Sequence, residues 1–176
     1  MHNRLLYLAV AALAGTSALA GGCNSNDGIV VDLDNAIRVN DAADEVIGTM
    51  ADAINEGLLV TDDLKSEHLT EPAGDAQVPA ATPPTFKWHT IQTARHGVST
   101  GDFTWLRFEA AGYAEPIDVI ALTVEEWTPS ADEWARLTAA TGPVKVTLTN
   151  AFAMVGIVKE GPYRSTAPTT TFTITH

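Results

Sequence analysis

The chain of 176 residues has 22 acidic and 10 basic side chains, so its formal net charge at pH 7 is −12. This acidity excludes nucleic acid as an expected partner, because such a partner requires a basic surface that neutralises phosphates. The chain has one cysteine, Cys23, which excludes an internal disulfide bond and leaves the use of that thiol to be explained.

A basic tip, an apolar stretch and small residues open the chain. Arg4 precedes sixteen uncharged residues, Leu5–Ala20, and two glycines follow. This order is typical of a secretory signal peptide. A transmembrane helix is the alternative, but sixteen residues rise only about 24 Å, less than a hydrocarbon core of about 30 Å. We therefore expect residues 1–22 to be a signal peptide that is removed on export.

The residues around Cys23 suggest a lipid anchor. Leu19, Ala20, Gly21 and Gly22 precede the cysteine. This stretch resembles the lipobox of bacterial lipoproteins, although Ala20 stands where the family usually has leucine. The resemblance covers only the leader, and it implies cleavage before Cys23, a diacylglycerol thioether on its sulfur and often acylation, such as palmitate, of its amine. Stable anchoring requires two or three such chains.

The first mature residues continue this interpretation. In the lipoprotein family the residue after the cysteine helps to select the membrane, and Asn24 is not the aspartate that signals inner-membrane retention. An exported, membrane-anchored protein is expected, in the outer membrane if the cell has two. Residues 23–33 start with the polar stretch Asn24–Gly28, which predicts a tether between the lipid and the protein.

Acidic side chains are concentrated after Cys23. Residues 24–75 have 13 acidic and 2 basic side chains, whereas residues 76–176 have 9 and 7. The imbalance predicts two parts with different surroundings, and anionic lipid headgroups should repel the acidic part. A well-hydrated surface explains the acidity better than a dedicated cation-binding region does.

Residues 34–60 have the spacing of an acidic amphipathic helix. Asp34 or Asn35 can cap its start, and Gly57 can end it. The helix is expected to pack on the protein's own sheet, and the alternative is a structural lipoprotein in which this helix mediates assembly. Its apolar stripe consists of Val39, Ala43, Val46, Met50 and Ala53, widened by Ile47 and Ile54.

Residues 61–84 are rich in proline and predict a linker or a long surface loop. Residues 85–176 predict a β-rich domain, interrupted near 130–138 by a short helix that Ser130 and Glu133 begin with a capping box. The fold class expected is therefore α+β, an N-terminal amphipathic helix with a mainly antiparallel β-sheet or β-sandwich. The expected strands are 86–94, 103–110, 117–124, 144–149, 151–158 (with a bulge at Gly156) and 169–175.

No residue pattern predicts catalysis or a metal site. His89 and His96 are seven residues apart, but the spacing places no third ligand. Asp27, Asp32 and Asp34 lack the glycine and glutamate of a calcium-binding EF-hand loop. Adjacent Glu125 and Glu126 would face opposite sides of a strand, Ser99 lies in a glycine-flanked turn, and no phosphate-binding loop is present. We expect no enzyme activity, cofactor or metal.

Tryptophan residues are the remaining candidates for binding. Trp105 lies in the most apolar strand and is expected in the core, whereas Trp88 and Trp127 stand beside charged residues. Exposed aromatic side chains can stack on sugars or anchor a protein. The prediction is a lipid-anchored envelope lipoprotein whose β-rich module binds an unknown protein or glycan through Trp88, His89 and Trp127. An enzyme with a dispersed site remains a second alternative.

Overall fold

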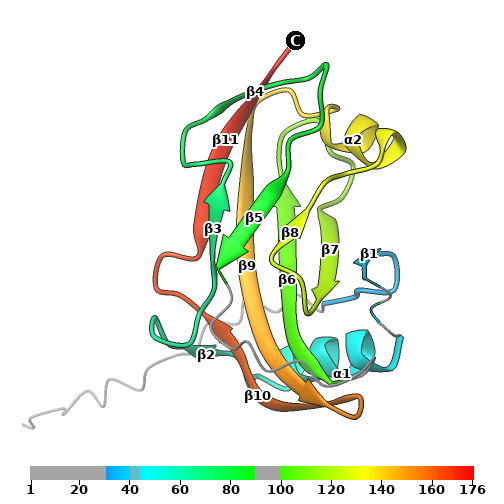
Figure 1. Ribbon diagram of the computed structural model, residues 1–176, viewed down its shortest axis with the longest axis vertical. Coiled ribbons are helices and arrows are strands. Elements are labelled where there is room, and N and C mark those ends of the chain that lie inside the picture. The colour runs from blue at the N-terminus through cyan, green and yellow to red at the C-terminus, as the bar shows by residue number, and fades with distance from the viewer. Residues whose placement is uncertain (1–30, 41, 43, 90–99) are drawn as a thin grey trace, which may run out of the picture.

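The computed structural model describes residues 31–40, 42, 44–89 and 100–176 (Figure 1). The predictions for the signal peptide, Cys23 and Asp27 lie outside these residues, as do those for His96 and Ser99. The described chain is mostly β-sheet with two helices, so the predicted β-rich domain is confirmed. No helix in the described ranges is both long and apolar enough to cross a membrane.

The larger sheet has eight strands and is built around one long strand, β9. Strand β9 pairs with β6 along one edge and with β10 and then β11 along the other, all antiparallel. Strands β1, β2 and β4 join the sheet through parallel pairs with β7, β10 and β11. Its strands are β1 (Ile37–Val39), β2 (Val60–Thr61), β4 (Gln77–Pro79), β6 (Gly101–Glu109), β7 (Ile117–Leu122), β9 (Pro143–Met154), β10 (Ile157–Arg164) and β11 (Thr169–Thr175).

A second sheet of three strands covers one face of the first. It consists of β3 (His68–Glu71), β5 (Phe86–His89) and β8 (Glu126–Trp127), with β5 in the middle. Aromatic and aliphatic side chains fill the space between the two sheets, which burial from water stabilises. This core includes Phe86, Trp88 and Trp127 of the small sheet and Phe108 and Phe172 of the large one.

Helix α2 (Ala131–Leu137) extends that layer beside the small sheet. Both bonds of the capping box are present, since Glu133 N–H donates to Ser130 Oγ and Ser130 N–H donates to the Glu133 carboxylate. Trp134 and Leu137 are buried in the same core, and the Trp134 Nε1 donates to the carbonyl of Ala80 at 2.7 Å.

Helix α1 (Asp44–Asn55) covers part of the opposite face of the large sheet, with Val46 and Met50 fully buried. The prediction that helix begins near Asp34 is wrong, because Ile37–Val39 forms β1 against β7. The helix ends at Asn55, five residues before the predicted bound of residue 60 and two before Gly57, the residue predicted to end it. Gly57 has a φ of 79°, and the amide of Leu58 donates to the carbonyl of Ala53, as in a glycine C-cap.

Two further predictions need correction. Residues 61–84 are not a linker, because they contain β3 and β4, whose Leu69 and Val78 are buried in the core. Residues 151–158 are not one strand with a bulge. Strand β9 ends at Met154 and β10 begins at Ile157, because the two residues between them have positive φ and form a tight turn.

Candidate binding site

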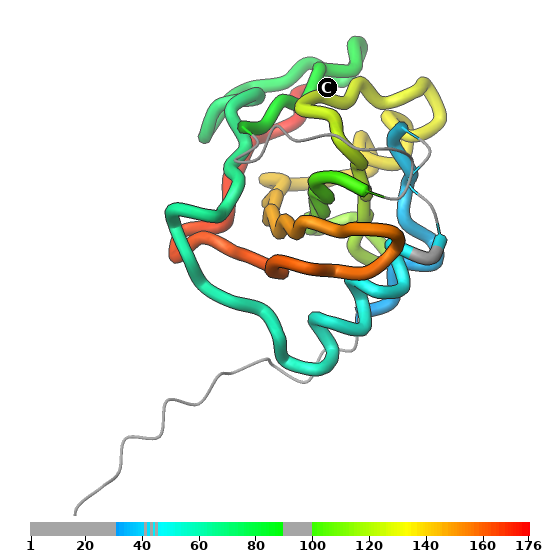
Figure 2. Tube along the Cα trace, turned by 60° about the horizontal axis from the view of Figure 1, so that its bottom comes forward, coloured from blue at the N-terminus to red at the C-terminus, as the bar shows by residue number. Residues whose placement is uncertain are grey.

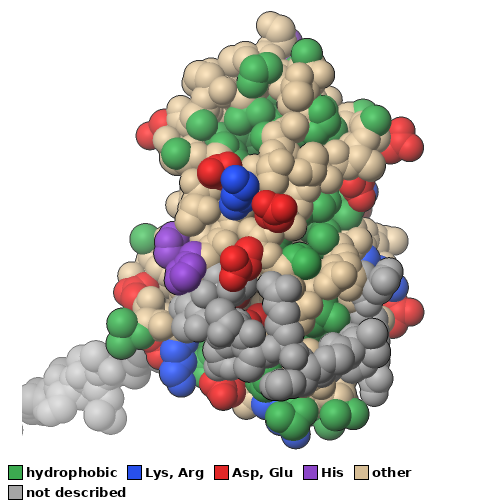
Figure 3. Space-filling model, viewed as in Figure 1, with side chains coloured by type: hydrophobic (Ala, Val, Ile, Leu, Met, Phe, Trp, Pro, Cys, Tyr) green, Lys and Arg blue, Asp and Glu red, His purple; other side chains and the backbone are tan. Residues whose placement is uncertain are grey.

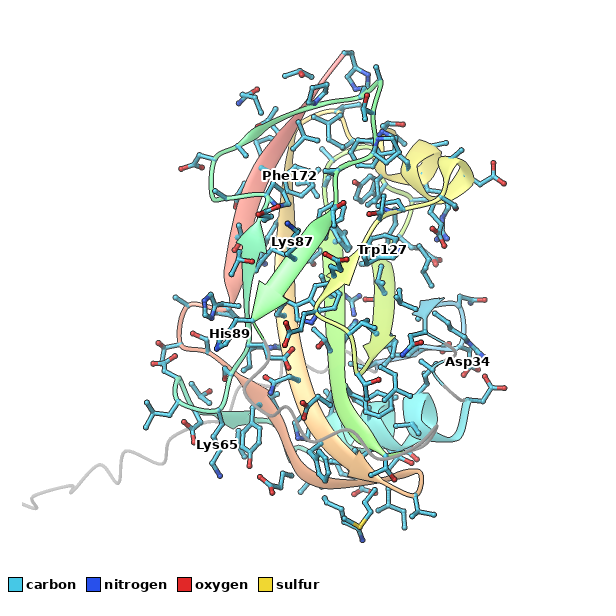
Figure 4. The ribbon with its side chains drawn as sticks, viewed as in Figure 1. Asp34, Lys65, Lys87, His89, Trp127 and Phe172 are labelled. Atoms are coloured by element: carbon cyan, nitrogen blue, oxygen red, sulfur yellow. The ribbon has the colours of Figure 1, made fainter. Side chains whose placement is uncertain are left out.

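The prediction that Trp88 and Trp127 form an exposed surface is wrong. Trp88 is 3 % exposed and Trp127 is 6 % exposed, and the Trp127 ring stacks on Phe86 with 5.5 Å between centroids. Successive residues of a strand point to opposite faces, so the charged neighbours of a buried tryptophan are the residues that face water. In β5 Lys87 accordingly lies toward the outside, as Figure 4 shows.

His89 is exposed on the outer face of the small sheet, where it pairs with His68 of β3. The two imidazole centroids are 5.9 Å apart, and Lys87 forms an ion pair with Glu71 at 3.1 Å beside them. Figure 3 shows these histidines next to charged side chains of both signs. Within the described ranges no three His, Cys, Asp or Glu side chains are arranged to hold a metal ion.

The other predicted polar positions have local structural roles. Asp32 Oδ1 accepts a hydrogen bond from the backbone N–H of Asp34 at 2.9 Å, which closes an aspartate turn. Glu126 lies opposite Lys87 in the β5–β8 pair. Neither contact brings a second carboxylate or a base close enough for acid–base chemistry.

Glu67 is a buried carboxyl group that sequence reasoning missed. It is 2 % exposed, and Thr104 Oγ1 donates to its Oε2 at 2.5 Å. Burial raises the pKa of Glu67 to about 8, against the opposing effect of the Thr104 hydrogen bond, and Asp102 raises it further. A cavity of about 180 Å³ lies nearby, lined by Asp102, Asn150 and Tyr163 among others, but Glu67 does not line it.

The face of the large sheet that carries α1 is apolar at one end and polar at the other. Helix α1 covers the end of β6 that contains Phe103, and Trp105 marks the boundary. Beyond it the register places Arg107 between Asp118 of β7 and Thr147 of β9. We call this half of the sheet the polar face, made of Arg107, Glu109, Asp118, Lys145, Thr147, Thr149 and Arg164.

Two guanidinium groups lie against Trp105 on the polar face. The Cζ atoms of Arg107 and Arg164 are 5.7 and 5.9 Å from the indole centroid, within the range of a cation–π contact. The indole Nε1 donates to Asp118 Oδ1 at 2.8 Å, and Arg107 Nη1 is 3.9 Å from the same oxygen. Asp118 is thus the counter-charge of Arg107.

Arg164 has hydrogen bonds but no carboxylate partner. Its Nε and Nη2 both donate to Thr149 Oγ1, at 3.0 and 2.8 Å, which uses two of the five N–H donors of a guanidinium. No ion pair of Arg164 occurs in the described part of the chain, although the protein is strongly acidic. Burial lowers the pKa of Arg164 and the neighbouring charge of Arg107 lowers it further, against the opposing attraction of Glu109. The Arg164 guanidinium is therefore a partly buried cation with N–H donors that have no partner among the hydrogen bonds of the described residues.

Asp118 belongs both to the polar face and to the lining of a further cavity. This cavity, of about 530 Å³, lies between the starts of β1 and β7 and the end of α2. Cavities of this size hold small ligands such as a sugar unit. Its polar lining includes Asp32, Asn35, Tyr113, Glu115, Asp118 and Arg136.

The arrangement suits an anionic ligand group. A planar guanidinium with unused donors binds a carboxylate or phosphate in two parallel hydrogen bonds, and an adjacent guanidinium adds attraction. Sequence reasoning missed this face because Arg107 and Arg164 are far apart in the chain and come together only through the β6–β9–β10 pairing. Comparison with known proteins gives no relative, since no family model, no curated protein and no solved structure matches the chain.

Proposed function

We propose that the chain is a lipid-anchored lipoprotein of the bacterial cell envelope, and that its β-rich domain is a non-catalytic binding module for an anionic ligand. The anchor is the acylated Cys23, in the outer membrane if the cell has two membranes. The ligand class is a glycan or protein segment that carries a carboxylate or a similar oxyanion. The proposal needs no cofactor.

The observation that carries the ligand class is Arg164. Desolvating a cation costs free energy unless it is paired, and this guanidinium has a threonine hydroxyl and the Trp105 ring as neighbours, with Glu109 attracting it without an ion pair. An oxyanion placed against Arg164 and Arg107 would supply the missing partner. In a protein of net charge −12 such a local pair of cations also gives the ligand one defined place to bind.

The assembly alternative has less support. It requires an apolar helix stripe that is open to another molecule, but Val46 and Met50 of α1 are buried in this chain's own core. An experiment can therefore distinguish the two functions by showing whether binding requires the polar face or the helix.

The binding proposal is tested with the protein from residue 23 onward carrying Cys23→Ser. It is titrated by calorimetry with an oligosaccharide of uronic acids and with its neutral counterpart. We expect binding of the acidic sugar only, and a loss of about tenfold or more in affinity for Arg164→Gln, because a charge-assisted hydrogen bond contributes about 1.5–3 kcal/mol.

The matched control is Lys145→Gln on the same face. The Lys145 Nζ is already paired with Glu109 at 3.2 Å and is 53 % exposed, so its removal should change the affinity less than about twofold. Equal losses in both variants would mean that only net charge matters. Binding that survives Arg164→Gln unchanged would contradict the proposed site.

The anchor is tested separately by mass spectrometry of protein extracted from membranes. A first residue Cys23 that carries acyl chains is expected, and Cys23→Ser should move the protein into the soluble fraction. An intact Met1, or an unmodified thiol on Cys23, would contradict the lipoprotein assignment.

A further inference from the structure

Large apolar side chains that are exposed gather at one end of the molecule. Among the described residues they lie on three segments: the residues after α1 together with β2, the turn after β2, and the β9–β10 turn. In Figure 1 these segments lie at the opposite end from α2 and β4, and Figure 3 shows hydrophobic side chains along that lower edge. The exposed residues are Leu58, Val60, Leu64, Met154, Val155 and Ile157.

The β9–β10 turn is the tip of this end, and its sequence is unfavourable in water. Val155 and Gly156 have φ values of 52° and 75°, and they connect Met154 to Ile157, which pair directly. A two-residue turn with positive φ at both positions favours Asn-Gly. A β-branched residue is a conformational outlier there. Val155 is also 72 % exposed, so this turn is costly both in backbone conformation and in hydration.

Val31, the first described residue, is held by the end of α1. The Asn55 side chain, at the end of α1, bonds the backbone of Val31 in both directions, at 2.8 and 3.0 Å. Thr49 of the same helix donates to the Gly156 carbonyl at 2.7 Å, and Figure 2 shows α1 beside the turn. Thr49 and Asn55 are six residues apart, about 9 Å along a helix. Val31 and the β9–β10 turn therefore contact the same helix, at points about 9 Å apart along its axis.

The length of chain before Val31 limits how far the domain can stand from its anchor. Cys23 is eight residues earlier, and eight residues span at most about 29 Å even when fully extended. An acyl chain on Cys23 would therefore hold the exposed apolar end close to the bilayer at all times. Such proximity raises the effective concentration of the second contact, so a weak insertion becomes sufficient.

We propose that the β9–β10 turn, Met154–Ile157, inserts into the interface of the membrane that anchors Cys23, so that the domain is docked on the bilayer and not merely tethered to it. This inference rests on the lipid anchor of the proposed function. The lipid surface is zwitterionic, because the exposed charges on α1, β10 and the residue after α1 are mainly acidic, with Asp52, Glu56 and Glu160 against Lys159, and anionic headgroups would repel this net negative charge. Apolar side chains at such an edge are typical of interfacial insertion.

The test supplies the anchor chemically, so that it does not depend on acylation in the cell. The protein from residue 23 onward has one thiol, Cys23, which is coupled to maleimide-phosphatidylethanolamine in phosphatidylcholine vesicles. Hydrogen–deuterium exchange of residues 152–158 is measured on the vesicles and in solution. We expect exchange about fivefold slower or more on the vesicles, with no change for residues 79–83 at the opposite end.

Val155→Asn is the informative variant, because it improves the turn while removing the apolar side chain. It should raise the Tm of the soluble protein and abolish the protection on vesicles. Ala81→Asn, an exposed position near β4 at the far end, is the matched control and should change neither. Vesicles that contain phosphatidylglycerol should give less protection of the turn than phosphatidylcholine alone.

Three results would overturn the inference. The first is exchange of residues 152–158 that is the same on vesicles and in solution. The second is protection that survives Val155→Asn. The third is a dimer in solution that Val155→Asn dissociates, which would make the apolar end a contact between copies. An unmodified Cys23 in membrane extracts would instead contradict the proposed anchor and would leave the vesicle result unchanged, so the two failures are distinguishable.

Discussion

The two faces of the eight-stranded sheet are buried by different means. The face toward β5 is covered by a second sheet and by α2, and its interior is mostly apolar and aromatic, with the Glu67 carboxyl and the Thr104 hydroxyl buried as one hydrogen-bonded pair. The opposite face is apolar only under α1, and beyond Trp105 it keeps two guanidinium groups and a carboxylate partly buried. Apolar packing stabilises the fold, whereas partly desolvated charges add little or cost stability. The face toward β5 therefore mainly stabilises the fold, whereas stability does not explain the partly buried charges on the face that carries α1.

The largest effect is expected where α1 meets the sheet. Met50→Asp should destabilise the protein by about 4 kcal/mol or more, because Met50 is fully buried among apolar side chains and an unpaired charge there is very costly. Asp52→Asn on the exposed side of the same helix should change stability by less than about 0.5 kcal/mol. Chemical denaturation measures both. A Met50→Asp protein that unfolds like the parent and only loses self-association would support assembly through the helix.

The next largest effect is expected in the aromatic core between the two sheets. Trp127→Ala should cost about 3–5 kcal/mol, since its ring is buried and packs against Phe86 and Phe108. His89→Ala on the outer surface of the small sheet should cost less than about 0.5 kcal/mol. Thermal melts of the two variants compare an inward and an outward position of that sheet. Similar melts for the two would contradict the burial of the indole.

These contrasts show what the sequence could predict. Alternation of apolar and polar residues, or apolar residues on both faces, predicted strands that overlap β5, β6, β7, β9 and β11, and the Ser130–Glu133 pair predicted the start of α2. The short strand β8 and the division between β9 and β10 were not predicted. The same alternation, applied consistently, would have placed Trp88 in the core, because Lys87 and His89 on either side of it face water. The charged neighbours of Trp88 wrongly suggested that its own side chain is exposed.

Other features depend on contacts that no local pattern records. Ile37–Val39 continues the helical stripe of the next residues, and only the parallel pairing with β7 makes it a strand. Short strands such as β4 are too brief to stand out among prolines. The Arg107–Trp105–Arg164 arrangement joins residues from β6 and β10 that are not even adjacent strands, since β9 lies between them. The candidate site could not have been assembled from spacing alone.

A third prediction uses pH to isolate the buried acid under the small sheet. The ordinary pKa of a glutamate, 4.5, becomes about 8 for Glu67 in the folded protein because of its burial. The folded state keeps this proton while the unfolded state loses it, so the contribution to stability is full below pH 4.5 and is lost as the pH rises to about 8. The loss should be on the order of 5 kcal/mol, at about 1.36 kcal/mol for each pH unit between the two pKa values.

Glu67→Gln removes this titration and supplies the control. The variant should be more stable than the parent at pH 8.5 and similar to it at pH 4.5, because the neutral amide mimics the protonated acid. Urea denaturation at a series of pH values measures the difference. A parent protein whose stability is flat between pH 5 and 8 would mean that Glu67 is ionised in the fold and has a partner that holds its charge.

The smallest effect is the sharpest test of the polar face. If Arg164 is present for a ligand, its partly desolvated charge costs stability, and Arg164→Gln should leave the protein as stable or stabilise it by up to about 1 kcal/mol. Arg107→Gln should have the opposite sign, a loss of about 1 kcal/mol, because it leaves the mostly buried Asp118 carboxylate without its guanidinium. A structural role for both arginines predicts losses in both variants. Denaturant midpoints at constant pH distinguish these two cases. When an anionic ligand is added, the midpoint of the Arg107→Gln protein should rise, whereas that of the Arg164→Gln protein should not change.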